Sequence, residues 1–173
     1  KMLYRLNFYW EYVNEIMPPI LSVNGKSKKV LILDCDNTLW NGILGEDGPE
    51  GINMSPDNSV GKVFFQIQNI LLNMTKEGVL LCICSKNNIE DVNNILSNHK
   101  DMILNNEHFA AKEVNWNNKI NNIKTLSKKL NLSFESFVFL DDSDFEINLV
   151  KQYLPDVKAI KVPEDIFEYE NKL

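Results

Sequence analysis

The sequence is poor in the residues that crosslink small extracellular domains. It has three cysteines among 173 residues, an odd number without a CxxC spacing, so neither a disulfide framework nor a zinc knuckle is indicated. It also lacks an internal repeat and a low-complexity tract. Reduced thiols are typical of cytoplasmic proteins, and we expect a cytoplasmic location.

Long apolar runs and clusters of basic residues are absent as well. The longest strongly apolar run, Val79–Cys84, has six residues, far fewer than the roughly 20 needed to cross a bilayer, and no signal-peptide pattern is visible. Acidic residues outnumber basic ones by 24 to 18, which gives a net charge of −6 and a pI near 5.0. Because phosphate contacts dominate nucleic-acid binding, we expect neither a nucleic acid nor a membrane as a partner.

What is present is typical of one compact α/β domain. Hydrophobic residues make up 44% and charged residues 24% of the chain, as in soluble globular proteins. Short apolar runs predict buried strands, and stretches with helical periodicity lie between them. The predicted strands are 30–33, 79–84, 102–104, 137–140 and 157–160, and the predicted helices are 59–76, 88–97, 118–130 and 144–152. This alternation predicts a parallel sheet covered by helices on both faces, a Rossmann-like three-layer sandwich.

Two further segments complete the predicted organisation. Residues 3–16 mix aromatic and aliphatic side chains at helical spacing, and Pro18-Pro19 ends that segment, because proline cannot continue a helix. We therefore divide the chain into a leader helix and linker at residues 1–27 and a main domain at residues 28–173. Glycines and prolines between residues 40 and 58 indicate a small flap within that domain.

Acidic and polar residues follow three of the predicted strands. Asp34 and Asp36 come directly after the first, Ser85 follows the second, and Asp141-Asp142 follow a third. In open parallel sheets ligands bind at the carboxyl ends of the strands, so these side chains should meet at one edge. Bare carboxylates are costly to bury; together they suit Mg²⁺, with Lys119 available to neutralise a phosphate. Each acid alone has an ordinary alternative role as a helix cap or turn former.

These motifs, in this order, resemble those of the haloacid dehalogenase (HAD) superfamily. Its first motif, apolar residues followed by D-x-D-x-T, matches residues 30–38, and its Ser/Thr, Lys and acidic-pair motifs match Ser85, Lys119 and Asp141-Asp142. The resemblance implies that residues 28–173 are a HAD-like catalytic domain working through a phosphoaspartate. Ser85 and Lys119 would hold the transferring phosphoryl group.

The same resemblance implies roles for the acids. Asp34 would be the nucleophile and Asp36 the general acid and base. Mg²⁺ would be held by Asp34, by the Asp36 carbonyl and by Asp142, with Asp141 acting through water.

A longer match is similar to the FkbH-like branch of this superfamily. It comprises Leu33–Gly42 with Gly45–Gly48 and Glu50–Ile52, Cys84–Asn87, Phe109–Ala111 with Asn115-Trp116 and Lys119, and Phe137–Asp142, within about residues 28–165. Small departures are Asn41 in place of glycine, His108 in place of an acid, and the local sequence 112–114. The resemblance implies a bifunctional enzyme of polyketide biosynthesis, part of a larger polyketide synthase system. It would take a glyceryl unit from 1,3-bisphosphoglycerate, remove the phosphate and load the unit as a thioester onto an acyl carrier protein.

The spacing between the motifs limits what can be inserted in the domain. Many HAD enzymes carry a cap domain that excludes water from the site. Here 46 residues separate Thr38 from Ser85, and a flap plus one helix use them. Another 33 residues separate Ser85 from Lys119, enough for one helix and one strand. We expect an essentially capless enzyme, whose open site suits a substrate on a phosphopantetheine arm.

Acyl transfer needs either a cysteine of the enzyme or direct attack by the carrier's own thiol. Cys35, between the two acids of the first motif, is the first candidate. Mg²⁺ and Lys119 would favour its thiolate, while the neighbouring acids would oppose it. Cys84 is the second candidate, and Cys82 shares its face deeper in the strand. The alternative for each is a small buried hydrophobe.

Five further residues are candidates for substrate contacts: Asn37, Thr38, Trp40, Lys86 and Asn87. Packing of the flap is the alternative for Trp40, as it is for Trp116, and a turn role is the alternative for Lys86 and Asn87. Two other functions stay open. One is a plain magnesium-dependent HAD phosphatase acting on a phosphoprotein or small phosphoester, and the other is a carrier-protein docking module with a vestigial site.

Overall fold

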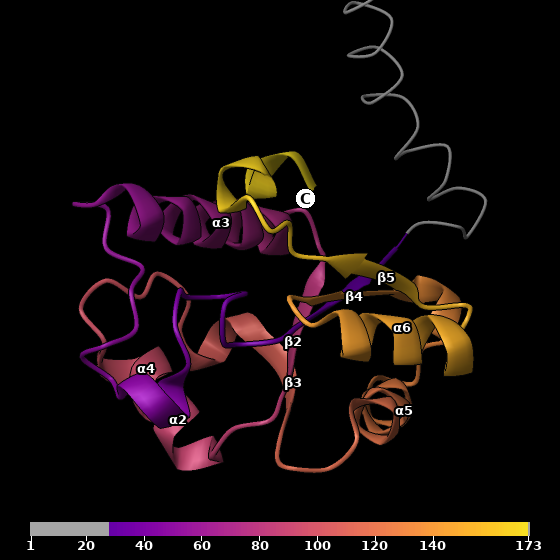
Figure 1. Cartoon of the computed structure of the whole chain (residues 1–173). Coiled ribbons are helices and arrows are strands. Elements are labelled where there is room, and N and C mark those ends of the chain that lie inside the picture. The colour runs from indigo at the N-terminus through magenta and orange to yellow at the C-terminus, as the bar shows by residue number, and fades with distance from the viewer. Residues whose placement is uncertain (1–27, 173) are drawn as a thin grey trace, which may run out of the picture.

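The computed structural model describes residues 28–172, which form a five-stranded parallel sheet covered by helices (Figure 1). The strands are β1 (Val30–Leu33), β2 (Leu80–Ser85), β3 (Phe109–Val114), β4 (Phe137–Asp141) and β5 (Lys158–Lys161), in the order β3-β2-β1-β4-β5. The helices are α2 (Leu44–Asp47), α3 (Ser59–Lys76), α4 (Ile89–Asn98), α5 (Lys119–Leu130) and α6 (Asp144–Tyr153), with 3-10 helices η1 (Asn106–His108), η2 (Phe134–Ser136) and η3 (Ile166–Lys172). The predicted leader helix and linker at residues 1–27 lie outside the described residues.

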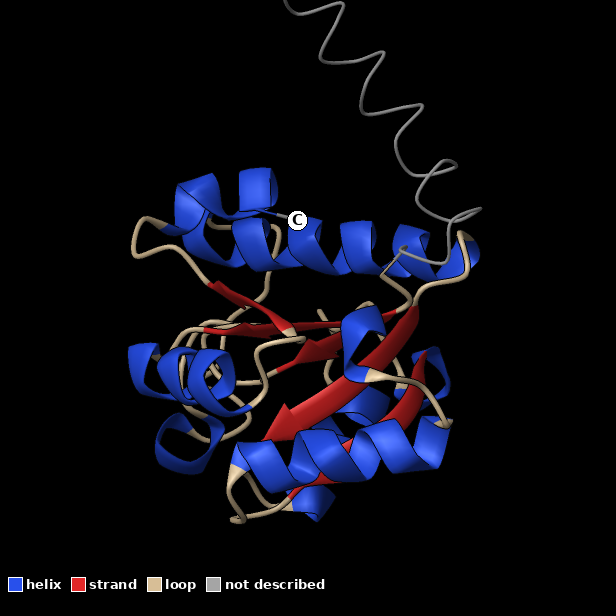
Figure 2. Cartoon of the chain, turned by 90° about the vertical axis from the view of Figure 1, so that its right-hand side faces the viewer, coloured by secondary structure: helices blue, strands red, loops and turns tan. Residues whose placement is uncertain are grey.

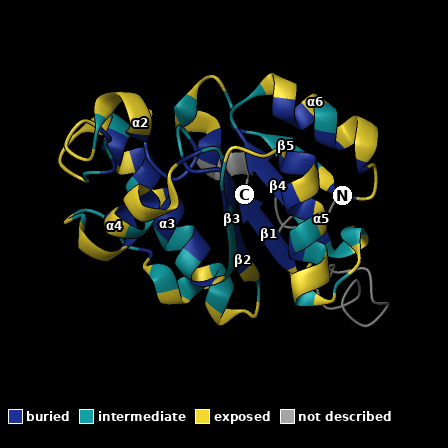
Figure 3. Cartoon of the chain, turned by 90° about the horizontal axis from the view of Figure 1, so that it is seen from below, coloured by how far each residue is buried: buried dark blue, intermediate teal, exposed yellow. Residues whose placement is uncertain are grey.

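The side chains of the sheet alternate between two hydrophobic cores. On β1, Leu31 and Leu33 point to the core built with α3 and α4, while Val30 and Ile32 point to the core built with α5 and α6. This alternation follows from the two-residue period of a strand. Helices therefore lie on either side of the strands (Figure 2), and the strands between them are buried (Figure 3). The predicted three-layer sandwich is confirmed.

Asparagine begins three of the helices. Asn58, Asn88 and Asn118 precede α3, α4 and α5, and the side chain of each accepts a hydrogen bond from a main-chain N–H of the first turn. Such caps satisfy donors that have no partner inside the helix. Gly78, at φ 89°, follows the end of α3 as predicted, because glycine adopts the left-handed conformation without a steric penalty. The four helices predicted within the main domain are confirmed to within two residues at each end.

One predicted strand is wrong, and one observed strand was missed. Residues 102–104 are not a strand; the main-chain N–H groups of Ile103 and Leu104 donate instead to the side-chain oxygen of Gln68 on α3. The missed strand is β3, one of the two edge strands of the sheet. Its sequence FAAKEV has no apolar run, and its middle residues are partly or fully exposed. An edge strand is not buried on both faces, so its sequence lacks the continuous apolar run by which a central parallel strand is predicted.

The glycine-rich segment after β1 forms the predicted small flap. It contains the one-turn helix α2 and is closed by a bridge between Asn41 and Asn53, with Gly42 at φ 102° and Gly48 at φ 71°. Within residues 28–172, no domain is inserted between β1 and β2 or between β2 and β3. None of the described helices has the length and apolar character needed to span a membrane.

Candidate active site

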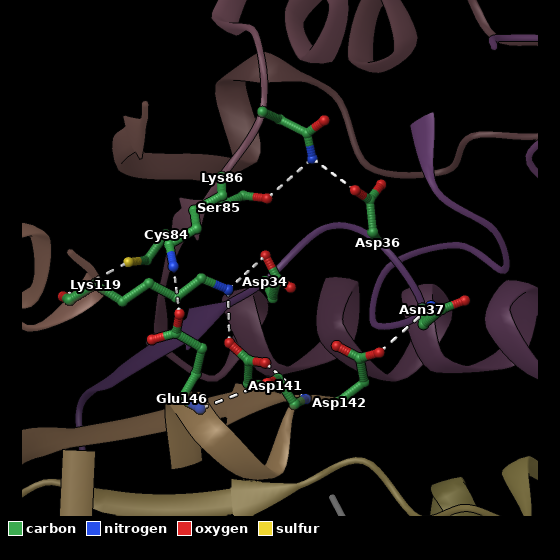
Figure 4. Close-up of polar contacts among 12 residues, drawn as sticks. Asp34, Asp36, Asn37, Cys84, Ser85, Lys86, Lys119, Asp141, Asp142 and Glu146 are labelled. Carbon is green, nitrogen blue, oxygen red and sulfur yellow. Dashed lines mark hydrogen bonds and ion pairs between the residues drawn. The ribbon is translucent and has the colours of Figure 1, made fainter. Parts of the chain in front are cut away.

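The sheet register brings the predicted motifs to one edge. Leu33 on β1 is level with Ile83 on β2 and with Leu140 on β4. The polar residues that follow each strand therefore emerge side by side (Figure 4). They line a hollow of about 210 Å³. Its lining residues are Asp34, Asp36, Ser85, Lys86, Lys119, Asp141, Ser143 and Glu146.

Lys119 is the buried cation of this site. As the first residue of α5 it points back to the strand ends, where its Nζ lies 2.9 Å from Asp34 Oδ1 and 2.6 Å from Asp141 Oδ2. Burial lowers the pKa of the ammonium group, but the two carboxylates outweigh burial and raise that pKa above its ordinary value. Lys119 is therefore charged, and it binds two acids at once.

Three acids lie close enough together to bind a cation. One carboxylate oxygen each of Asp34, Asp141 and Asp142 lies within 4.8 Å of the others. Burial and then the charge of Asp34 raise the pKa of Asp141 to about 7 and raise the pKa of Asp142 above its ordinary value. After burial, the largest cause of both shifts is repulsion by the charge of Asp34. Lys119 alone does not balance their charge, and a hard divalent cation fits this oxygen-ligand set.

Asp34 has a buried oxygen with a single partner. Its Oδ1 contacts Lys119 Nζ at 2.9 Å and accepts no other hydrogen bond among the described residues. A carboxylate oxygen beside one donor keeps a free lone pair, so Oδ1 also has the capacity to bind a cation.

Asp36 is held by three donors in a fixed orientation. Its Oδ1 accepts hydrogen bonds from Trp40 Nε1 at 2.9 Å and from Leu44 N at 3.0 Å. Its Oδ2 accepts one from Asn87 Nδ2 at 2.9 Å, and the same amide donates to Ser85 Oγ at 3.1 Å. Oδ2 has fewer donors than Oδ1, so it is the oxygen with a lone pair left for proton transfer.

Asn37 links the first motif to the acidic pair. Its Nδ2 donates to Asp142 Oδ2 at 3.3 Å, and its Oδ1 accepts from Gly42 N at 3.0 Å. The residue has a φ of 50°, which asparagine tolerates better than most side chains. Asn37 therefore orients Asp142 and the flap together.

Other predicted contact residues have structural roles here. Trp40 and Thr38 are fully buried; Trp40 orients Asp36, which favours the packing alternative, and Thr38 Oγ1 has no partner among the described residues. Asn87 is buried and bonded within the site. By contrast, Trp116 in the loop before α5 is 75% exposed.

Lys86 forms an ion pair that the sequence analysis missed. Its Nζ lies 2.6 Å from Oε1 of Glu146, a buried residue of α6. The pair lines the hollow, and it orients the Lys86 ammonium toward Glu146. The available signal was an acid in the first turn of the helix that follows Asp141-Asp142.

All three cysteines are buried. Burial, and next the charge of Asp34, raise the pKa of Cys35 well above its ordinary value, although a hydrogen bond with Ser85 opposes this. Burial likewise raises the pKa of Cys82 to about 11 and that of Cys84 further. For Cys35 the structure favours the alternative of a small buried hydrophobe over the catalytic thiol, because its side chain joins the α3 core.

Comparison with known proteins supports the fold. No protein-family model and no curated protein matches the chain. Among solved structures it is similar to the N-terminal part of the protein BF1531 from Bacteroides fragilis, which contains a phosphatase domain and is complexed with Mg. The two are 37% identical with a TM-score of 0.86 over 90% of this chain, and the chain spans 42% of the length of that protein.

Two more distant structures share the fold alone. The HAD-family enzyme BT-2542 from Bacteroides thetaiotaomicron, in complex with magnesium and inorganic phosphate, is 13% identical, with a TM-score of 0.53 over 77% of this chain and 93% of that one. An uncharacterized protein from Corynebacterium glutamicum is 12% identical, with a TM-score of 0.54 over 84% and 91%. The chain thus has the Rossmann-like α/β fold that it shares with this phosphatase domain and with the HAD-family enzyme.

Proposed function

We propose that this chain is a magnesium-dependent phosphatase of the HAD type that transfers a phosphoryl group to Asp34. The observation that carries the proposal is the arrangement of Asp34, Lys119 and Asp141 around an open hollow, with Asp142 in the same cluster of acids. The likeness to a phosphatase domain complexed with Mg, at 37% identity, supports it.

Asp34 and Asp142 would hold the magnesium ion directly, together with the Asp36 carbonyl. Asp141 is already paired with Lys119, and it accepts a hydrogen bond from Ser143 N at 2.9 Å. It would therefore contact the magnesium ion through a water molecule. When bound, Mg²⁺ neutralises the phosphoryl oxygens and lets an anionic substrate enter an acidic hollow.

The side chains then divide the work of phosphoryl transfer. The Asp34 carboxylate attacks phosphorus, the bond from phosphorus to the leaving-group oxygen breaks, and Asp36 gives that oxygen a proton. Asp36 next takes a proton from water, which attacks the aspartyl phosphate and releases inorganic phosphate and free Asp34. Lys119 and the Ser85 hydroxyl hold the phosphoryl group, so catalysis depends on alignment and charge.

Hydrolysis of para-nitrophenyl phosphate with and without Mg²⁺ tests this proposal. We expect turnover that requires Mg²⁺, is abolished in Asp34→Asn, and leaves a mass increase of one phosphoryl group on the wild-type protein under rapid quenching. Asp144→Asn is the matched control, because Asp144 is an exposed acid of α6 outside the cluster, and it should retain full activity. Turnover that persists in Asp34→Asn would refute the assignment of the nucleophile.

A second, finer function is glyceryl transfer to an acyl carrier protein in polyketide biosynthesis, with 1,3-bisphosphoglycerate as donor. Two observations favour a protein-tethered substrate. The described chain has no inserted cap. The second observation concerns two exposed aromatic side chains, Trp116 and Phe145, which are 75% and 65% exposed. Each shortly precedes in sequence a residue that lines the hollow, Lys119 and Glu146 respectively. Since all three cysteines are buried, we propose direct attack by the carrier's thiol on the carbonyl carbon of the acyl phosphate. The thioester bond forms as the bond from this carbon to the phosphate oxygen breaks and inorganic phosphate leaves, and the phosphatase site then hydrolyses the remaining phosphate ester to give the glyceryl thioester.

Intact-protein mass spectrometry with Mg²⁺, 1,3-bisphosphoglycerate and a holo carrier protein tests that finer function. Direct attack predicts a glyceryl adduct on the carrier that forms equally with wild type and with Cys35→Ala. Loss of the adduct in Cys35→Ala would assign the acyl group to that cysteine instead. Phosphate release without any adduct would leave the plain phosphatase.

A further inference from the structure

The last described segment, η3, packs against α3 (Figure 1). Its residue Tyr169 is fully buried in the core that also holds Leu39 and Phe64. The Tyr169 ring packs edge-to-face on Phe64 of α3, with ring centroids 6.2 Å apart and an interplanar angle of 75°. This packing fixes the position of the Tyr169 hydroxyl.

That hydroxyl reaches the loop that follows β1. It donates a hydrogen bond of 3.1 Å to the main-chain carbonyl oxygen of Thr38, across 131 positions of sequence. A carbonyl oxygen only accepts, so the direction of the bond is certain. Burial, followed by the charges of Asp34, Asp142 and Asp141, raises the pKa of Tyr169 well above its ordinary value. The hydroxyl is therefore a neutral donor at every working pH.

The loop that receives this bond contains the proposed nucleophile and the general acid. Inside the loop, the N–H groups of Thr38 and Leu39 both donate to the Cys35 carbonyl, at 3.2 and 2.8 Å. Asn37 is in the left-handed region, and such a conformation persists where the surroundings determine it. From outside the loop, Gln68 on α3 donates to the Leu39 carbonyl at 2.9 Å. The Tyr169 bond fixes the neighbouring carbonyl.

We propose that Tyr169 is a positioning residue of the active site, whose hydrogen bond to Thr38 holds the turn from Asp34 to Asp36 in its reactive geometry. It acts through the main chain and touches no reacting atom. The inference rests on the proposed phosphatase function. It assigns η3 a role in positioning the first motif, from which Tyr169 is separated by 131 positions of sequence.

Tyr169→Phe tests the inference, because it removes the hydroxyl and keeps the ring on Phe64. Two readouts are needed: hydrogen–deuterium exchange of a peptide covering residues 34–44 in the absence of substrate, and kcat and KM for para-nitrophenyl phosphate at saturating Mg²⁺. Val63→Ala is the matched control, since it removes buried methyl groups from α3 and is expected to lower the Tm by a similar amount.

We expect faster exchange of residues 34–44 in Tyr169→Phe. We also expect kcat to fall about tenfold and KM to stay within twofold of the wild-type value. The expected fall in kcat is smaller than the roughly hundredfold loss that follows a 1 Å misplacement of a reacting group. Val63→Ala should leave both readouts unchanged. Exchange and kcat like those of wild type in Tyr169→Phe would overturn the inference, as would equal effects in both variants. If the wild type hydrolyses no phosphate ester, the proposed function fails, and the exchange of residues 34–44 alone then decides the role of Tyr169.

Discussion

A single lysine balances the charge of the candidate site. Lys119 is nine-tenths buried or more, and it is shared by two carboxylates that otherwise face each other. Removing one partner of a buried ion pair leaves an uncompensated charge, which costs far more than the net contribution of the pair. The same residue thus links the stability of the domain to the chemistry of the hollow.

Lys119→Met is expected to lower the free energy of unfolding by about 3–5 kcal/mol in EDTA and to abolish phosphatase activity. Urea denaturation measures the first effect. Lys161→Met is the matched control, because Lys161 pairs with Asp144, whose side chain is 69% exposed, and surface pairs contribute less than about 1 kcal/mol. Equal destabilisation by the two variants would contradict the buried role of Lys119.

The thiols give a second residue-level prediction. Burial raises the pKa of each cysteine, so the thiols stay protonated at pH 8 and react slowly with Ellman's reagent. We expect no rapid labelling of the native protein and three thiols after denaturation. One thiol that reacts rapidly in the native protein would favour an acyl-enzyme route over direct attack by a carrier.

At the scale of the element, the start of α5 determines where Lys119 lies. Asn118 caps this helix by accepting a hydrogen bond from Ile120 N at 2.8 Å, and Lys119 is the next residue. A cap that normally only stabilises a helix therefore also positions a site residue. The flap has a similar double role, since Trp40 and Leu44 both donate to Asp36.

Asn118→Ala should destabilise the protein by about 1 kcal/mol and also lower kcat, because the first turn that carries Lys119 frays. Asn58→Ala removes the equivalent cap of α3 and should cost a similar free energy without a loss of kcat. Thermal unfolding and steady-state kinetics of the pair separate the two effects. A loss of kcat in both variants would show that general stability, and not the position of Lys119, limits turnover.

At the scale of the whole molecule, the cluster of Asp34, Asp141 and Asp142 makes the stability of the folded state depend on pH. The folded protein raises the pKa of Asp141 from its ordinary 3.8 to about 7, through burial and the charge of Asp34. The folded state therefore keeps a proton that the unfolded chain has released. This contribution to stability is fully present below pH 3.8 and is lost as the pH rises to about 7.

We expect the urea midpoint in EDTA to fall as the pH rises through this window, and Mg²⁺ to offset the fall because it favours the ionised acids. The variant Asp141→Asn should lack this component of the pH dependence. Urea titrations between about pH 4 and pH 8, with EDTA or with Mg²⁺, measure it. A wild-type midpoint in EDTA that rises across the window would contradict the repulsion between Asp34 and Asp141.

The sequence by itself determined the layers of this molecule and the position of its chemistry. Runs such as Val30–Leu33 and Phe137–Leu140 are apolar because both faces of a central parallel strand are buried. The acids that follow them have to emerge at one edge, because parallel strands all end there. Both features depend on the local pattern of apolar and acidic residues, so they are predictable from the sequence alone.

Only the tertiary structure decided which partner each polar group has. The edge strand β3 depends on pairing with β2, and the amides of residues 103 and 104 depend on Gln68 from α3. The Lys86–Glu146 pair and the Tyr169–Thr38 bond join residues 60 and 131 positions apart. The burial of Cys35 follows from the direction of its side chain into the α3 core. Contacts between residues so distant in the chain have no local pattern, because they exist only once the layers have packed.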